Sequence, residues 1–170
     1  MIEGLVADLK VVTRQAYHIK ICIPKLLFDF GLTKFKEQTI LIQVDTISQK
    51  FKYKVERRVL NKFEVFTQIN LVPKELLLSQ KIFASVNRKR LMGRDFFDIV
   101  FLYGIGAKPN MEYLDINLGI RTEKELKNYY LSKISTLNFI ALSKDLEPLL
   151  FNKRDVNKVL LFKEFAESNF

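Results

Sequence analysis

The residues best suited to chemistry are five charged side chains in one short stretch of the chain, Lys81, Arg88, Arg94, Asp95 and Asp98. The two aspartates are three residues apart, so on a helix they project from neighbouring positions of one turn. Carboxylates this close repel each other unless a cation lies between them. We therefore expect one of the three basic side chains, or a bound metal ion, to compensate the pair.

The same spacing also has a purely structural interpretation. Acidic residues in the first turn of a helix complement the helix macrodipole. Arg94 and Asp98 have the spacing of an ordinary ion pair along one helix. Taken alone, the spacing favours this interpretation over a functional site.

Two consecutive helices are expected to position the charged residues. Pro73 suits the first position of a helix, and an apolar stripe at helical spacing follows it, formed by Leu76, Leu77, Ile82, Phe83 and Val86. The polar face of this helix is expected to hold Lys74, Lys81, Ser85 and Arg88. Gly93 is expected to end the helix. A second helix then begins near Arg94, with inward-facing residues Phe97, Val100 and Phe101.

Strands are expected before these helices, in a sheet over residues 17–70. After a helix over 2–14, the pattern predicts strands at 17–23, 39–46, 50–55 and 63–69, with a loop or short helix at 24–36. The run 40–42 is typical of a strand buried on both faces. Asp45 follows it at the strand end, where ligands of α/β sheets commonly bind.

Helices are expected from Pro73 onward, at 73–89, 94–104, 110–118, 122–134, 136–151 and 154–167. Thr122 and Glu125 have the spacing of a capping box. Strands first and helices second indicate an α+β fold. Because the run GIGAKPN gathers two glycines and a proline, we expect a domain boundary near 105–109, between regions 1–106 and 107–170.

The charge of the 170-residue chain is concentrated in its middle. The net charge is +9, and residues 50–94 contain twelve Lys or Arg against three Glu. Such a segment suits nucleic-acid phosphates, and its candidate contacts are Lys52, Lys54, Arg57 and Arg58. A solvated basic surface or a face for an acidic protein partner would give the same composition.

Location and cofactors are constrained by what the sequence lacks. Cys22 is the only cysteine, which excludes an intramolecular disulfide and a cysteine metal site. His18 is the only histidine and has no partner at nucleophile or metal-ligand spacing. No apolar run is long enough to span a membrane and no signal-peptide pattern is present, so we expect a cytoplasmic protein without a membrane partner.

The segment 73–103 resembles the C-terminal motifs of the AbiEii/AbiGii-type nucleotidyltransferase toxins. The family pattern, a helix with a lysine, then an arginine, then Arg-Asp-x-x-Asp, is matched here by SQKIFASVNR and GRDFFDIVFL. Weaker similarity extends over about residues 1–120, through HIKICIPKLLFDFGL, ILIQVDTIS and KPNMEYLDINL. The resemblance implies a partial nucleotidyltransferase-like mixed sheet followed by a C-terminal helical bundle.

The resemblance also implies roles for individual residues. Asp45, Lys81 and Asp98 correspond to catalytic positions, with Asp45 the residue that would help to hold metal. The nucleotide phosphates would contact Lys20, Lys81, Arg88 and Arg94, and Asp95 would orient Arg88 or Lys81. The family reaction transfers a nucleotide from an NTP, with Mg²⁺, to an RNA or protein acceptor. Its setting is a toxin–antitoxin or phage-defence system with an antitoxin protein as partner.

One departure from the family affects the expected activity. The family's Gly-Ser turn and metal-binding Asp-x-Asp pair are both missing from this sequence. We therefore expect the C-terminal part of a longer gene product, an internal-start product or a degenerate relative, which does not transfer nucleotides without an N-terminal partner fragment. The alternative is a non-catalytic module that binds nucleic acid or an antitoxin.

Overall fold

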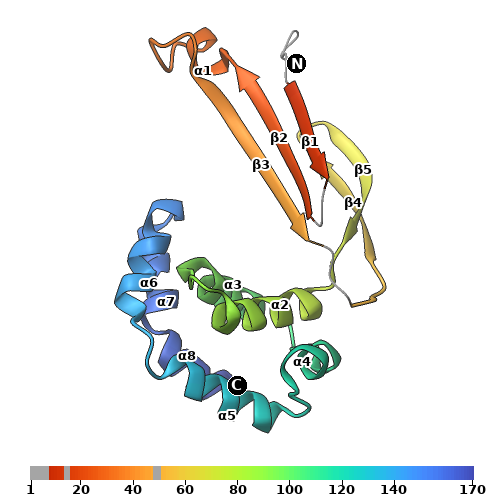
Figure 1. The fold of residues 1–170 in the computed structure, drawn as a ribbon, viewed down its shortest axis with the longest axis vertical. Coiled ribbons are helices and arrows are strands. Elements are labelled where there is room, and N and C mark those ends of the chain that lie inside the picture. Colours follow the sequence, from red (N-terminus) through yellow and green to blue (C-terminus); the bar gives the residue numbers. More distant parts are fainter. Residues whose placement is uncertain (1–7, 14–15, 48–50) are drawn as a thin grey trace. The chain divides into compact units, whose positions relative to one another are not determined.

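The structure is a computed structural model of the chain and describes residues 8–13, 16–47 and 51–170. It separates into two compact units, residues 1–52 and residues 53–170. Strands come first and helices second, which confirms the expected α+β class. Figure 1 shows the two units, and each is described here by itself.

The first unit contains a three-stranded antiparallel sheet in the order β1–β2–β3, formed by β1 (Asp8–Thr13), β2 (Ala16–Pro24) and β3 (Thr39–Ile47) (Figure 1). The short helix α1 (Leu26–Asp29) lies between β2 and β3, and Gly31 follows it with a left-handed φ of 66°. The expected helix over 2–14 is wrong for residues 8–13, because the β-branched run 11–13 favours an extended strand. The remaining residues of that helix lie outside the described part of the chain.

Strand β3 differs from the expectation in its burial. Its apolar residues Leu41, Ile42 and Val44 are all exposed, so the prediction of a strand buried on both faces is wrong. The strand pairs antiparallel with β2, and antiparallel sheets need not be covered on both sides.

The second unit begins with a β-hairpin. Strands β4 (Glu56–Lys62) and β5 (Val65–Leu71) pair antiparallel, and the register Lys62↔Val65 leaves a two-residue turn between them. The expected strand at 50–55 is wrong for residues 51–55, which have no regular structure. Residues 56–62, which lie between the expected strands 50–55 and 63–69, themselves form strand β4.

Helices form the rest of the second unit (Figure 1). They are α2 (Lys74–Asn87), α3 (Gly93–Gly104), α4 (Met111–Leu118), α5 (Glu123–Ile134), α6 (Phe139–Leu146), α7 (Asn157–Leu160) and α8 (Phe162–Asn169). Two 3₁₀ turns, Glu147–Leu149 and Lys153–Val156, interrupt the last two expected helices. Thr122 and Glu125 form the predicted capping box.

The core of this unit surrounds α3, which packs against α2, α6, α7 and α8. The predicted inward face of α3 is wrong, because Phe101 is exposed and the fully buried apolar residues are Phe96 and Ile99. From Phe96 to Leu102 every residue of α3 except Asp98 is apolar, so spacing within this stretch does not determine which residues are buried. In α2, Leu77 was expected in the apolar stripe but is exposed, and its neighbour Leu78 lies in the core.

The expected domain boundary at 105–109 lies inside the second unit. Helix α2 contacts α3, α4 and α5, so elements on both sides of that segment share one core. The Lys74 Nζ atom also donates hydrogen bonds to the carbonyl oxygens of Ile105 (3.1 Å) and Gly106 (3.2 Å). These bonds satisfy carbonyl groups just after the end of α3 and tie the segment to α2.

Candidate functional site

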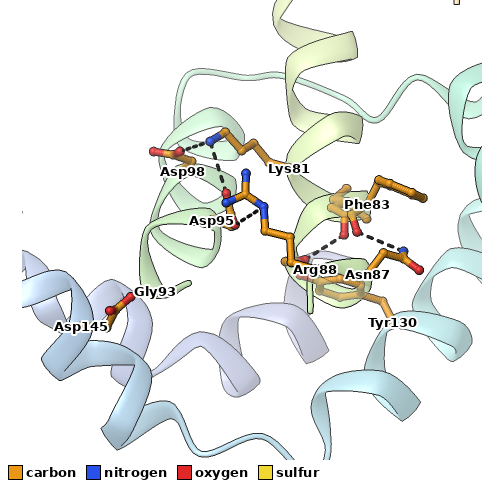
Figure 2. Close-up of polar contacts among 11 residues, drawn as sticks. Lys81, Phe83, Asn87, Arg88, Gly93, Asp95, Asp98, Tyr130 and Asp145 are labelled. Atoms are coloured by element: carbon orange, nitrogen blue, oxygen red, sulfur yellow. Dashed lines mark hydrogen bonds and ion pairs between the residues drawn. The ribbon is translucent and has the colours of Figure 1, made fainter. Parts of the chain in front are cut away.

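Helices α2 and α3 bring Lys81 between the two neighbouring aspartates, as Figure 2 shows. The Lys81 Nζ atom lies 2.6 Å from Asp98 Oδ2 and 3.3 Å from Asp95 Oδ1. The cation that the spacing of the carboxylates required is therefore Lys81. We call Lys81, Arg88, Asp95 and Asp98 the α2–α3 cluster.

Asp95 is the inner member of the cluster, and its side chain is fully buried. Arg88, the residue that follows α2, places its Nε atom 3.4 Å from Asp95 Oδ2. Asp95 Oδ2 is buried and accepts no hydrogen bond from the described residues, so Arg88 compensates it by charge alone. Asp95 thus holds Lys81 and Arg88 in place.

The outer members of the cluster can be reached from solvent. The side chains of Lys81, Asp98 and Arg88 are 23%, 35% and 40% exposed. Two cations face two carboxylates, so the cluster carries no excess charge. Because Asp98 is more exposed than Asp95, an anionic ligand can reach Lys81 from the side of Asp98.

A buried hydrogen bond between Ser85 and Tyr130 joins α2 to α5 near the α2–α3 cluster. The Ser85 hydroxyl donates to the Ile82 carbonyl oxygen (2.8 Å), so the Tyr130 hydroxyl donates to Ser85 Oγ (2.7 Å). Burial raises the pKa of Tyr130 far above its ordinary value, and the nearby Asp95 charge adds to the shift. The phenol therefore stays protonated and keeps this bond. Ser85 was expected on the exposed polar face, but it is buried.

Gly93 positions the start of α3 rather than ending α2. A Cβ atom at Gly93 would overlap the backbone carbonyl of Leu142 in α6, so only glycine fits. Asp145 accepts hydrogen bonds from the Gly93 N–H (3.4 Å) and from Arg90 (3.2 Å). Sequence reasoning missed Asp145, because the residue is 52 positions from Gly93 and no local pattern links them.

A cavity of about 330 Å³ adjoins the outer side of the cluster. Arg94 and Asp98 line one side of it, and the segment 146–155 supplies Leu146, Leu149, Leu150, Phe151, Asn152 and Asp155. Arg94 is exposed, and among the described residues no ion pair joins it to Asp98. Arg94 therefore remains available to an anion, unlike Lys81.

The other residues predicted for this site lie in the first unit. Asp45 is exposed in β3, and Gln43 Nε2 donates hydrogen bonds to both of its carboxylate oxygens, at 3.1 and 2.9 Å. Lys20 is exposed in β2, in register with Gln43. A site shared by Asp45, Lys81 and Asp98 stays a prediction, because these residues belong to different units.

The four predicted nucleic-acid contacts are divided between the two units, with Lys52 in the first and Lys54, Arg57 and Arg58 in the second. Lys52 and Lys54 are exposed outside the strands. Arg57 and Arg58 are consecutive in β4 and so point to opposite faces of the hairpin. Arg58 pairs weakly with Glu56, at 3.5 Å and with both side chains exposed.

The α2–α3 cluster does not fit a Mg²⁺ site. Mg²⁺ requires oxygen ligands in octahedral geometry, and here the Lys81 ammonium occupies the space between the two carboxylates. No group of three or more His, Cys, Asp or Glu side chains within the described ranges could hold a metal ion. In the described part of the chain, no helix has the length and apolar character needed to cross a bilayer.

Comparison with known proteins adds no relative. The chain matches no protein-family model, no curated protein and no solved structure.

Proposed function

We propose that the chain is a nucleotidyltransferase-like protein of the AbiEii/AbiGii toxin type that binds NTP at the α2–α3 cluster but does not complete transfer alone. The observation that supports this proposal most is the position of Lys81, 2.6 Å from Asp98 and 3.3 Å from Asp95. The Lys, Arg and Arg-Asp-x-x-Asp residues that carry the family resemblance thus converge on one partly exposed site. The proposed setting is a toxin–antitoxin or phage-defence system.

The burial of the two aspartates suggests how a triphosphate would bind. Asp95 is fully buried and keeps the Lys81 amine in place. Asp98 is exposed enough to move, so a phosphate oxygen can replace it as the partner of Lys81. Arg88 and Arg94 add positive charge at the rim. The released Asp98 carboxylate can then accept the proton of an attacking hydroxyl group.

Calorimetric titration of the chain with NTP tests the binding step. Lys81→Ala removes the phosphate partner and should weaken binding by about tenfold or more, the effect of losing a charged hydrogen bond. Asp98→Asn removes the competing carboxylate and should tighten binding. The control is Lys124→Ala, an exposed helix lysine of α5. Unchanged affinity in Lys81→Ala would exclude the cluster as a nucleotide site.

A transfer assay tests the second half of the proposal. With NTP, Mg²⁺ and RNA, we expect no transfer by the 170-residue chain, because it has no Asp-x-Asp pair to hold metal. Adding a fragment with the Gly-Ser and Asp-x-Asp motifs should restore transfer, and Asp45→Ala should remove it again. Robust transfer by the chain alone, insensitive to Asp45→Ala, would contradict this proposal.

The second candidate function is non-catalytic binding of nucleic acid or an antitoxin. It is favoured by the contrast between the charge-balanced α2–α3 cluster and the exposed cations of the segment 52–58. Reversal of Lys52, Lys54, Arg57 and Arg58 to Glu should abolish RNA or DNA binding, and binding by the unmodified chain should weaken steeply with salt. Unchanged affinity in the reversed variant would mean that this segment is only a solvated surface.

A further inference from the structure

The tip of the β4–β5 hairpin exposes two aromatic rings. The Phe63 side chain, in the turn, is 88% exposed, and the Phe66 side chain, in β5, is 77% exposed. Within the described residues neither ring packs against another aromatic ring. Lys62 Nζ lies 5.4 Å from the centre of the Phe63 ring, which keeps a cation beside it.

One face of the hairpin combines Phe66 with groups that bind nucleotides. Directly paired residues share a face, so the register places Arg57 with Asn70, Val59 with Gln68, and Asn61 with Phe66. All six are exposed. This face therefore offers an aromatic surface, a guanidinium group and three side-chain amides to one ligand.

The turn holds Phe63 in a left-handed backbone conformation, which residues other than glycine and asparagine rarely adopt. Phe63 and Glu64 have left-handed φ values of 50° and 62°. A two-residue hairpin turn with two positive φ values is normally formed by Asn-Gly or a similar pair, because other side chains are strained there. An exposed ring in a strained turn contributes nothing to the core, and strain of this kind gathers at functional sites.

We propose that the hairpin binds a single-stranded nucleic acid, with bases stacked on Phe66 and on Phe63 at the tip, and with the backbone held by Arg57 on the Phe66 face. Bases of a single strand are free to stack on aromatic side chains, whereas those of a duplex are already stacked on each other. The exposed cations complement the phosphates. The inference rests on the nucleic-acid-binding function proposed for the basic segment, and it specifies the class of nucleic acid.

The test compares single strands with duplexes by fluorescence anisotropy on the full chain. The probes are labelled RNA and DNA oligonucleotides of about 12 nucleotides, a typical length for such sites, and duplexes of the same sequence. Phe63→Ala/Phe66→Ala should weaken single-strand binding by about tenfold or more, since each stacked base contributes substantially. Duplex affinity and the salt dependence should stay unchanged. Phe35→Ala is the control, because that ring is similarly exposed in the first unit.

A second variant separates loss of stacking from loss of folding. Phe63→Asn/Glu64→Gly installs the preferred turn sequence, so it improves the hairpin while it removes one ring. It also removes a negative charge, which on its own would favour nucleic-acid binding. Weaker single-strand binding in this variant would therefore come from the missing Phe63 ring.

Three results would overturn the inference, and they differ from one another. Single-strand affinity that survives the double alanine substitution would exclude stacking on the hairpin. Equal losses for single strands and duplexes would mean that the rings do not select single strands. If the unmodified chain binds no oligonucleotide, the nucleic-acid function itself is refuted. If the charge-reversed variant loses binding but the double alanine variant does not, the nucleic-acid function stands and stacking is refuted.

Discussion

In the α2–α3 cluster, Lys81 and Arg88 each lie within 3.4 Å of an aspartate oxygen, and the inner aspartate is buried. In the β4–β5 hairpin, by contrast, Arg57 and Lys62 form no ion pair with any described acidic side chain. The first arrangement holds two helices together, and its cations are already paired. The second leaves its charges available to a partner. A basic segment thus contains both kinds of cation, and its net charge does not distinguish them.

The aromatic residues differ between these regions in the same way. Phe162 is fully buried, and its ring centre lies 4.9 Å from that of Phe96 and 5.7 Å from that of Phe139. Phe66 in the hairpin is mostly exposed. Buried and exposed positions of the second unit should therefore respond differently to matched substitutions.

The largest effect is expected from truncating a buried ring. Phe162→Ala should lower the free energy of unfolding by about 3–5 kcal/mol, because it leaves a cavity in the core. Phe66→Ala should change it by less than about 0.5 kcal/mol, as for other exposed positions. Urea unfolding followed by circular dichroism measures both. Similar losses in the two variants would mean that the hairpin ring is packed, which would contradict the exposed hairpin surface.

Gly93→Ala should have the next largest effect. Its Cβ would overlap the Leu142 carbonyl, so α3 and α6 must move apart, at a cost of about 3 kcal/mol, the upper part of the range for overpacking. Gly104, at the other end of α3, has open space around its Cβ position. Gly104→Ala should be neutral or slightly stabilising, because alanine is the better helix former. Thermal unfolding of the two variants checks the pair, and a neutral Gly93→Ala would rule out the close approach of the helices.

The two aspartates of the cluster should differ in their effect on stability. Asp95→Ala leaves Lys81 and Arg88 facing a buried space and should cost about 2–3 kcal/mol, less than a fully buried pair because both cations can reach water. Asp98→Ala should cost less than about 1 kcal/mol, since Lys81 keeps Asp95 and the lost pair is partly exposed to solvent. Equal costs in urea unfolding would contradict the assignment of Asp95 as the inner, structural member.

Sequence spacing predicted those features that depend on neighbours along the chain. The α+β class, the helices after Pro73, the capping box at Thr122 and the need for a cation between Asp95 and Asp98 all follow from local rules. The buried side of α3 does not, because nearly every residue from Phe96 to Leu102 is apolar and spacing does not single out one side. The roles of Gly93 and Asp145 also arise from packing between distant helices, which spacing cannot reveal.

The limits of the hairpin strands were not predicted either, for a physical reason. Its strands alternate weakly between apolar and polar residues, and neither face is buried, so no pattern fixed the strand limits. The turn is Phe63-Glu64 rather than Asn-Gly, so the strongest local signal for a hairpin is missing. We infer that Phe63 and Glu64 occupy the turn because of binding rather than stability.

A change in the turn itself tests this last point. Phe63→Asn/Glu64→Gly should stabilise the hairpin by about 1–2 kcal/mol, because it relieves the left-handed strain at these positions. The helical core should unfold as before, since the change lies outside it. Hydrogen exchange of the β4 and β5 amides, measured by NMR, should slow in this variant, while exchange in α3 stays constant. Unchanged or faster exchange in the strands would show that Phe63 and Glu64 are not strained, and would remove the argument that they are present for binding.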